Sequence, residues 1–262
     1  MEIKNIDIVI PSFRSKELIS LAIKSFEKYR GNFNFKYIVV ENSNDTSYKE
    51  HVLSLSTDVL WVQNLVPSWE NSNSPYVGSE ANASGLEKGL ESVQAEYVFL
   101  IQNDVVACRD DWMSYLVSKI NDEVPMVTVR ENFANWGAPW RQAAGRIACT
   151  VGILVKTSIA KSVSMWPSGT DWDCGDELTR HCFDNGLNFF ACQNTASDES
   201  LIEKIQNDEY RNLPGVERVL NDNYEVIFMH LGRGAEKTLN RYRKPNKMLI
   251  PGWVKFVNEN VL

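Results

Sequence analysis

The stretch Tyr97-Val98-Phe99-Leu100-Ile101-Gln102-Asn103-Asp104 joins an apolar run to two amides and a carboxylate. A short apolar run bounded by polar residues is typical of a strand buried on both faces of a sheet. In α/β proteins, ligands bind in the crevice outside the carboxyl ends of such strands. The stretch therefore predicts an α/β sheet whose functional edge carries Gln102, Asn103 and Asp104.

Two earlier apolar runs end in the same way. Residues 6–10 lead into Pro11-Ser12-Phe13-Arg14, and residues 37–40 lead into Glu41. Between these two runs, apolar residues recur at helical spacing over residues 16–29. Strands that alternate with helices imply parallel pairing with right-handed crossovers. Three parallel strands would then deliver polar side chains to one edge of the sheet.

Together these segments resemble the nucleotide-sugar-binding half of family 2-like glycosyltransferases of the GT-A fold. In that family, the first strand reads roughly I-P-x-(Y/F)-N, the second ends in an acid followed by N-x-S/T-x-D, and a later strand ends in a D-x-D-like metal motif. The counterparts here are Ile10-Pro11-Ser12-Phe13-Arg14, Glu41-Asn42-Ser43-Asn44-Asp45 and Gln102-Asn103-Asp104. The resemblance covers about residues 5–235. It implies a Rossmann-like, mostly parallel central sheet flanked by helices, with a smaller acceptor-side subregion.

The chain reads as one compact domain, since nothing rich in Pro, Gly or Ser marks a linker in its middle. By the resemblance, residues 1–130 form the nucleotide-sugar (donor) binding half and residues 131–235 the acceptor-binding and catalytic half. Residues 236–262 form a basic C-terminal extension. Further strands are predicted over residues 59–62, 126–129, 147–155, 187–191 and 224–228. Further helices are predicted over residues 79–93, 112–120 and 176–185.

The composition bounds the class of protein. The chain has 262 residues, 44% of them hydrophobic, and a net charge of −7, which gives no general attraction to nucleic acid or anionic lipid. No run approaches the roughly 20 apolar residues that span a bilayer, and no leader peptide is recognisable. Five widely spaced cysteines without a C-x-x-C pair suit free thiols in a reducing compartment. We therefore expect a soluble, cytoplasmic protein.

The resemblance implies a donor site for a nucleotide diphospho-sugar. Asp104 and His230 would hold a divalent cation, Mn²⁺ or Mg²⁺, which bridges the two donor phosphates. Gln102 replaces the first acid of the metal motif, so dependence on a metal stays open. The structural alternatives are an Asp104 that caps the next helix and a His230 that only completes a strand. The other positions that the resemblance assigns to the donor are Pro11, Ser12, Phe13, Arg14, Glu41, Asn103 and Arg233.

Glu41 follows the second strand and, by the same resemblance, lies under the nucleotide base. Its carboxylate would accept a hydrogen bond from the imino N–H of uracil or guanine, and Phe13 would stack on the ring. A strand-end glutamate before Asn42-Ser43-Asn44-Asp45 also suits simple turn chemistry. Both interpretations stay open.

The densest acidic cluster is Asp171-Trp172-Asp173-Cys174-Gly175-Asp176-Glu177, directly before a predicted helix. In the resembled family, a carboxylate at this point removes the proton of the acceptor hydroxyl. Asp173 and Asp176 are the candidates for this catalytic base. Asp176 equally suits a structural role, because a negative charge at a helix N-terminus interacts favourably with the helix dipole.

Residues 233–247 carry six basic residues against one acid. They could close over the donor diphosphate, form a solvated helix face, or meet the phosphates of a nucleic-acid acceptor. Tryptophans on the acceptor side could stack on sugar rings or bases, or pack in the core. They are Trp136, Trp140, Trp166 and Trp172.

The leading hypothesis is a hexosyl- or pentosyltransferase that moves a sugar from a nucleotide diphosphate donor, such as a UDP-sugar, to a hydroxyl acceptor with inversion. The acceptor could be a glycan, a metabolite or, less favoured by the acidic composition, a modified DNA base. A nucleotidyltransferase is disfavoured because Pro11-Ser12-Phe13-Arg14-Ser15-Lys16 contains no glycine, whereas that class carries a glycine-rich loop there. A non-catalytic sugar- or nucleotide-binding scaffold is the third hypothesis, supported by Gln102.

Overall fold

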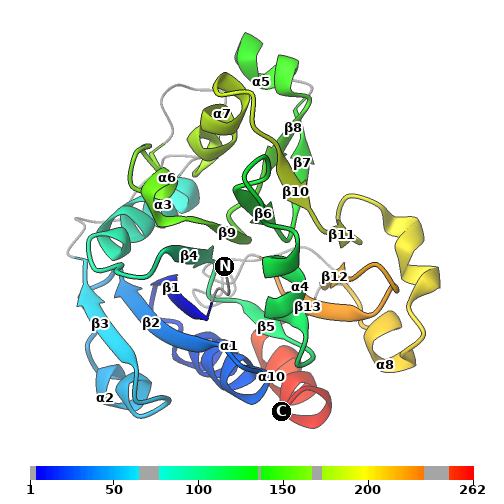
Figure 1. The fold of residues 1–262 in the computed structure, drawn as a ribbon. Helices are drawn as coiled ribbons and strands as arrows, with labels where there is room; N and C mark the ends of the chain where they lie inside the picture. Colours follow the sequence, from blue (N-terminus) through cyan, green and yellow to red (C-terminus); the bar gives the residue numbers. More distant parts are fainter. Residues whose placement is uncertain (1–3, 65–76, 135–136, 167–172, 233–247) are drawn as a thin grey trace.

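The structure is a computed structural model that describes residues 4–64, 77–134, 137–166, 173–232 and 248–262 (Figure 1). Its strands are β1 (Asn5–Ser12), β2 (Asn34–Glu41), β3 (Val59–Gln63), β4 (Tyr97–Ile101), β5 (Val105–Ala107), β6 (Met126–Thr128), β7 (Glu131–Phe133), β8 (Arg146–Ala148), β9 (Gly152–Lys156), β10 (Phe189–Ala191), β11 (Gln193–Asn194), β12 (Glu217–Leu220) and β13 (Val226–His230). Its helices are α1 (Lys16–Lys28), α2 (Lys49–Leu53), α3 (Val77–Leu90), α4 (Trp112–Ser118), α5 (Pro139–Ala144), α6 (Thr157–Ala160), α7 (Asp176–Asp184), the 3₁₀ helix η2 (Glu199–Lys204), α8 (Asp208–Arg211) and α10 (Ile250–Asn260).

The largest sheet has seven strands in the order β10-β6-β9-β4-β1-β2-β3. Its strand pairs are parallel except the two that β9 makes, with β4 and with β6. β4, β1 and β2 lie side by side, so their carboxyl ends share one edge (Figure 1). The prediction of a mostly parallel central sheet flanked by helices is confirmed.

The central strands are buried on both faces, which explains their unbroken apolar runs. On one face, Ile8 of β1 belongs to a core cluster with Phe26 of α1 and Trp112 of α4. On the other face, Val9 belongs to a cluster with Leu86 of α3. Because successive strand residues point to opposite faces, β1 anchors helices on both sides of the sheet.

A second sheet has the order β11-β12-β13-β5 and is antiparallel throughout. β5 begins directly after Asp104. β13 pairs with β5 so that His230 lies opposite Val105, and β12 pairs with β13 so that Glu217 lies opposite His230. Of these strands, only β13 was predicted, as residues 224–228. The sheet brings the chain at residues 217 and 230 beside the end of β4.

The prediction of one strand over residues 147–155 is wrong. β8 pairs with β7 in a separate two-stranded sheet, whereas β9 joins the central sheet. A turn at Thr150 and Val151 separates them, although Val151 is as buried as a strand residue. β9 restarts at Gly152, where a Cβ would lie 2.9 Å from Cγ2 of Val129. The apolar run therefore contains two strands that belong to different sheets.

The helix α10 packs on the first half of the fold. Trp253 of α10 is fully buried in a third core cluster, together with Leu18 of α1. Lys28, the last residue of α1, donates from Nζ to the carbonyl of Val261 at 2.7 Å. Among the helices of the described ranges, none is long and apolar enough to cross a membrane.

We predict that Gly89→Ala destabilises the fold. A Cβ at Gly89 of α3 would lie 2.3 Å from Cγ1 of Val9 in β1 and 3.1 Å from Cγ2 of Val40 in β2. Overpacking of this kind costs about 1–3 kcal/mol, which exceeds the gain in helix propensity of at most about 1 kcal/mol. Chemical denaturation should therefore show a lower free energy of unfolding.

Gly78→Ala is the matched control, since it makes the same substitution near the other end of α3. Gly78 is exposed, and a Cβ there would meet nothing within 4 Å. This variant should be as stable as the wild type or slightly more stable. Equal stability of both variants would contradict the close approach of α3 to the sheet.

Candidate functional site

The carboxyl edge of the central sheet collects the predicted donor segments. Ser12 at the end of β1 lies opposite Glu41 at the end of β2, and β4, on the other side of β1, ends at Ile101 just before Gln102. The loops that follow these three strands are therefore neighbours. This arrangement follows from the parallel pairing, as the sequence predicted.

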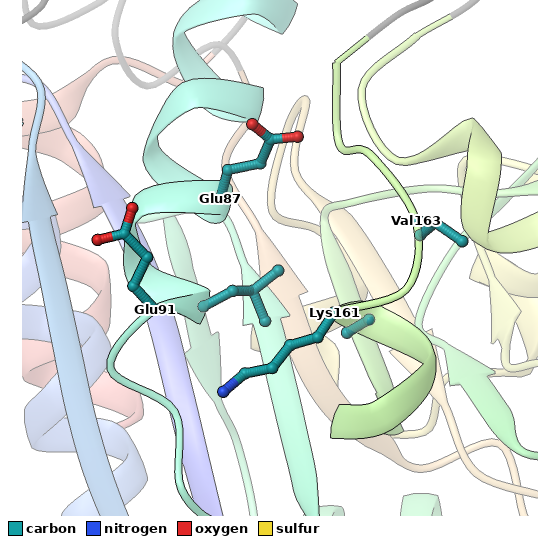
Figure 2. Close-up of a pocket in the computed structure, with 6 residues that line it drawn as sticks. Glu87, Glu91, Lys161 and Val163 are labelled. Atoms are coloured by element: carbon teal, nitrogen blue, oxygen red, sulfur yellow. The ribbon is translucent and has the colours of Figure 1, made fainter.

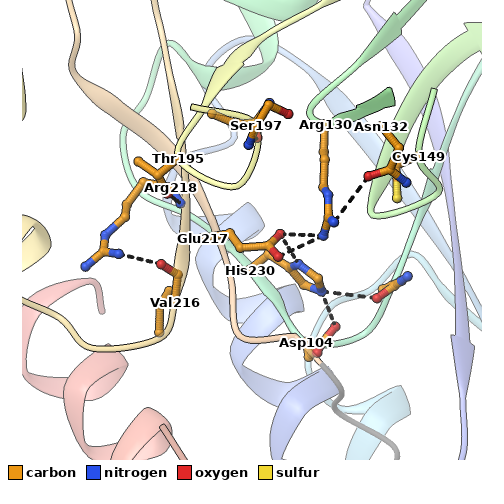
Figure 3. A network of polar contacts seen from close by, with 12 residues as sticks. Asp104, Arg130, Asn132, Cys149, Thr195, Ser197, Val216, Glu217, Arg218 and His230 are labelled. Atoms are coloured by element: carbon orange, nitrogen blue, oxygen red, sulfur yellow. Dashed lines mark hydrogen bonds and ion pairs between the residues drawn. The ribbon is translucent and has the colours of Figure 1, made fainter. Parts of the chain in front are cut away.

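Asp104 and His230 meet inside the protein. Both side chains are almost fully buried, and His230 Nε2 lies 3.3 Å from Oδ1 of Asp104. The same nitrogen lies 3.1 Å from Oε1 of Gln102. Figure 3 shows the imidazole ring of His230 directed at Asp104. The two residues that the resemblance assigns to a cation are thus brought together, although they are far apart in the sequence.

Glu217 and Arg130 complete this network on the far side of the imidazole (Figure 3). His230 Nδ1 lies 2.8 Å from Oε2 of Glu217. Arg130 donates from one guanidinium nitrogen to both Glu217 oxygens, at 2.8 and 3.0 Å. Sequence reasoning missed both residues. For Glu217, the available signal was the Asn221-Asp222-Asn223 turn between the apolar runs of β12 and β13, because such a turn predicts a hairpin.

The charges of this network control the pKa of His230. Burial alone would lower that pKa, but the carboxylates of Asp104 and Glu217 raise it to about 9. Burial would likewise raise the pKa of Glu217, yet the hydrogen bond and charge of His230, together with Arg130, hold it below its usual value. The imidazole thus lies between two carboxylates that favour its protonated form.

The donor atoms at Asp104 fit a divalent cation that is shared with a ligand. They comprise a carboxylate oxygen, the imidazole Nε2 of His230 and the amide oxygen of Gln102. Within the described ranges, no three or more His, Cys, Asp or Glu side chains gather as a metal cage. Mn²⁺ and Mg²⁺ commonly take one or two protein ligands and complete their shell with substrate phosphates and water. Binding at Nε2 would require its proton to leave.

Asp176 is buried in an ion pair. Its Oδ2 accepts from Nε of Arg141 at 3.0 Å, and both side chains are at most 3% exposed. The same oxygen accepts from the backbone N–H of Asp173 at 3.1 Å. Burial raises the pKa of Asp176 to about 6, although the bond from Asp173 and the charge of Arg141 act in the opposite direction. The carboxylate is thus engaged within the chain.

Asp173, in contrast, is exposed. Its Oδ1 accepts from the backbone N–H of Cys174 at 2.7 Å and from the hydroxyl of Ser79 in α3. Burial raises the pKa of the Cys149 thiol to about 11, Arg130 lowers it, and the charges of Asp173 and Glu217 raise it. Of the two candidate bases, Asp173 is the one with an accessible carboxylate.

Glu41 is fully buried, and both of its carboxylate oxygens are engaged. Oε1 accepts from the backbone N–H of Arg14 at 3.1 Å and from the backbone N–H of Ser43 at 3.0 Å. The hydroxyl of Ser43 also donates to Oε1, and the hydroxyl of Tyr48 donates to Oε2. This geometry favours the turn-chemistry interpretation, in which Glu41 fixes the loops after β1 and β2.

The loop after β1 presents two accessible side chains. Pro11 and Ser12 are buried, and Ser12 shares a 2.9 Å hydrogen bond with the hydroxyl of Tyr48. Phe13 is half-buried and Arg14 is exposed; the Arg14 guanidinium lies 5.7 Å from the Phe13 ring centre. Arg14 also has a left-handed backbone, with φ of 52°, and its N–H is held by Glu41. The loop thus offers an aromatic face and a cation.

Several predicted positions lie outside the described residues. They are Arg233 with the basic segment 233–247, Trp136, Asp171 and Trp172. Among the described positions, Asn103 is buried. Trp140 of α5 is half-buried, with the Arg180 guanidinium 5.8 Å from its ring centre, and Trp166 packs against a core cluster.

A surface pocket of about 370 Å³ lies between α3 and α6, lined by Glu87, Leu90, Glu91, Ala160, Lys161 and Val163 (Figure 2). Lys161 donates to the carbonyl of Val93, just before β4 begins. The pocket therefore lies toward the amino end of β4, whereas Asp104 follows its carboxyl end. Glu87 is already engaged by Ser164 and Met165. This pocket is not part of the candidate site.

The sequence matches no protein-family model and no curated protein. Solved structures do match. One is a mannosyltransferase from Pyrobaculum calidifontis in complex with GDP-Man and Mn²⁺, with a TM-score of 0.52 and 12% identity over 71% of this chain and 54% of that chain. The chain has the GT-A fold. This chain spans about half the length of that mannosyltransferase.

A second similar structure is glucosyl-3-phosphoglycerate synthase from Mycobacterium tuberculosis. It has a TM-score of 0.49 and 18% identity over 72% of this chain and 68% of that chain. At identities this low, the similarity concerns the fold. The GT-A fold inferred from the three strand-end motifs is confirmed, and the roles of individual residues stay predictions.

We predict that Asp176→Ala lowers the stability of the folded protein rather than acting on chemistry alone. The substitution leaves the buried Arg141 charge without its carboxylate partner. Breaking a buried ion pair in this way costs about 3–5 kcal/mol. Urea denaturation at neutral pH should show the loss.

Glu177→Ala is the control, because it removes a partly exposed pair with Arg180 on the same helix and should cost less than about 1 kcal/mol. The pH dependence gives a second test. Since the pKa of Asp176 is about 6 in the folded protein against an ordinary value of 3.8, the folded state binds this proton more tightly. Its contribution to the free energy of unfolding is therefore lost as pH rises from about 4 to about 6. Asp176→Ala should lack this contribution.

We predict that Glu41→Gln lowers stability without changing which nucleoside diphosphate binds best. The amide retains one acceptor but cannot accept at both positions, so the buried Tyr48 hydroxyl loses its charged partner. Hydrogen bonds to charged groups contribute about 1.5–3 kcal/mol. Thermal denaturation with and without UDP, GDP or CDP measures both properties, with the exposed Glu50→Gln as control. If Glu41→Gln were as stable as the wild type and preferred a different nucleoside diphosphate, the result would support a contact between Glu41 and the nucleotide base.

Proposed function

We propose that this protein is a glycosyltransferase that uses a nucleotide diphospho-sugar. The observation that carries the proposal is the buried Asp104–His230 pair, 3.3 Å apart, at the end of β4 in a GT-A fold. A mannosyltransferase of the same fold binds GDP-Man and Mn²⁺. The proposal assigns the corresponding donor chemistry to this chain.

The donor lies across the carboxyl edge of the central sheet. Phe13 and Arg14 meet the nucleotide, because they are the accessible side chains of the loop after β1. Asp104 and His230, with Gln102 beside them, hold a divalent cation. When bound, that cation offsets negative charge on the leaving diphosphate. Arg233 and the basic segment that follows are further candidates for contacts with the phosphates.

Asp173 acts as the catalytic base. Its exposed carboxylate accepts the proton of the acceptor hydroxyl while the hydroxyl oxygen bonds to the anomeric carbon. The bond from that carbon to the diphosphate breaks in the same displacement, which inverts the configuration. Asp176 holds Asp173 in place, since it accepts the Asp173 backbone N–H at 3.1 Å.

The acceptor is a hydroxyl compound on the side of the sheet that carries α5 and α7. Its class is left to experiment among a glycan, a metabolite and a modified DNA base. The net charge of −7 argues against a polyanionic acceptor. The sugar, whether a hexose or a pentose, is likewise a question for the donor screen.

We predict that Asp104→Ala abolishes cation-dependent donor binding, whereas Asp173→Asn retains it and loses turnover. Thermal shift measured with UDP, GDP, CDP and dTDP, with and without Mn²⁺, reports donor binding. For the wild type, one diphosphate should raise the melting temperature only when Mn²⁺ is present. Loss of a general base lowers the rate by about 10²–10⁴-fold, measured as release of nucleoside diphosphate from the matching sugar donor.

Asp122→Ala removes a fully exposed carboxylate and serves as the control for both measurements. A wild type that responds to no diphosphate would favour the non-catalytic scaffold. Release of pyrophosphate in place of a nucleoside diphosphate would favour the nucleotidyltransferase. Full turnover by Asp173→Asn would remove Asp173 from the role of base.

A further inference from the structure

The polar network around His230 extends beyond the two residues assigned to the cation. It runs in one line from Asn132 through Arg130, Glu217 and His230 to Asp104 (Figure 3). The members come from different parts of the fold. Arg130 lies between β6 and β7, Glu217 begins β12, and His230 ends β13. A chain of contacts of this kind can fix the orientation of the His230 imidazole ring.

The His230 ring has its two nitrogens engaged on opposite sides. Nδ1 lies 2.8 Å from Glu217 Oε2, and Nε2 lies 3.1 Å from Gln102 Oε1. Because a carboxylate can only accept, Nδ1 carries the proton of the first contact. This arrangement directs Nε2, the nitrogen available to a cation, toward Asp104. Rotation of the ring about its Cβ–Cγ bond would break the contact with Glu217.

Glu217 is itself held in place. Arg130 donates to both of its oxygens, at 2.8 and 3.0 Å, and contacts Asn132 at 3.2 Å through its other terminal nitrogen. In the strand pairing of β12 with β13, Glu217 lies opposite His230. The β12–β13 strand pairing and the ion pair with Arg130 therefore both restrict the position of the Glu217 carboxylate. Its oxygens have little freedom to leave the imidazole.

We propose that Glu217, held by Arg130, is the positioning residue that orients His230 and thereby sets the affinity of the donor site for its divalent cation. This inference rests on the proposed function for its link to a cation. The orientation of the ring is independent of that link. Carboxylates that accept from the distal nitrogen of a metal-binding histidine typically change metal affinity by 10–100-fold when they are removed.

A purely structural role makes a different prediction. The side chains of Arg130 and Glu217 are 27% and 28% exposed. Ion pairs with this degree of exposure change the folding equilibrium by less than about fivefold. If Glu217 only ties β12 to the loop after β6, its removal would slightly alter stability and leave the ring and the cation affinity unchanged.

The test compares Glu217→Ala and Glu217→Gln with Glu131→Ala. Glu131 forms a comparable pair with Arg146, at 3.2 Å, and its backbone carbonyl accepts from the hydroxyl of Ser197 rather than contacting His230. The first readout is NMR of the ring N–H proton of His230 in metal-free protein, assigned through His230→Gln among only three histidines. The second is binding of Mn²⁺ alone and with UDP or GDP, by electron paramagnetic resonance.

For Glu217→Ala we expect loss of the protected ring N–H signal and a 10–100-fold weaker Mn²⁺ affinity. Glu217→Gln should lie between this variant and the wild type, because an amide oxygen still accepts from Nδ1–H. Glu131→Ala should match the wild type in both readouts. An unchanged ring signal and unchanged Mn²⁺ affinity in Glu217→Ala would overturn the proposal.

The orientation of His230 by Glu217 and the cation affinity of the donor site can be tested independently. A wild type that binds no Mn²⁺, with or without a nucleoside diphosphate, would overturn the proposed donor site and the effect on cation affinity. The ring signal would still decide whether Glu217 positions His230. Conversely, normal Mn²⁺ binding by the wild type together with a ring signal that ignores Glu217 would overturn the positioning role and leave the proposed function standing.

Discussion

The register of the antiparallel sheet β11-β12-β13-β5 is the constraint on which the candidate site depends. It places His230 opposite Val105, which follows Asp104, and Glu217 opposite His230. A shift of one residue would turn the His230 side chain to the other face of the sheet. The end of β4 supplies Gln102 and Asp104, and the second sheet supplies Glu217 and His230. Backbone hydrogen bonds between distant segments thus bring the site residues together in the absence of ligand.

The acids around the site differ in what their oxygens contact. Glu41 and Asp176 accept hydrogen bonds from backbone and side chains of their own loops, so they shape those loops. Asp173 retains an exposed carboxylate, and its backbone is held by Asp176. Burial therefore distinguishes Glu41 and Asp176, whose oxygens are engaged within the chain, from the exposed Asp173. The backbone of Asp173 is held by Asp176, three residues further along the chain.

The sequence predicted the strands whose apolar pattern matches their place at the centre of the sheet. The apolar runs before Ser12, Glu41 and Gln102 are buried on both faces, so their pattern could only be that of central strands. Glu217 and Arg130 could not be found in this way, because their importance arises from pairing across sheets rather than from any motif. The run over residues 147–155 failed for a related reason. Its turn at Thr150 and Val151 stays buried, and an apolar pattern does not reveal a change of sheet.

Gln102 is consistent with the charge balance of the network. Asp104 and Glu217 both raise the pKa of His230, and Arg130 adds a positive charge beside Glu217, so acids and bases already face one another in the metal-free network. An acid at the half-buried position 102 would add a further negative charge beside His230, close to Asp104. The amide instead accepts from His230 without adding charge. If a divalent cation took the place of the His230 proton, as the proposed function requires, the network would gain one positive charge, and that excess would favour an anionic ligand such as a diphosphate. Cation and donor binding would then stabilise each other.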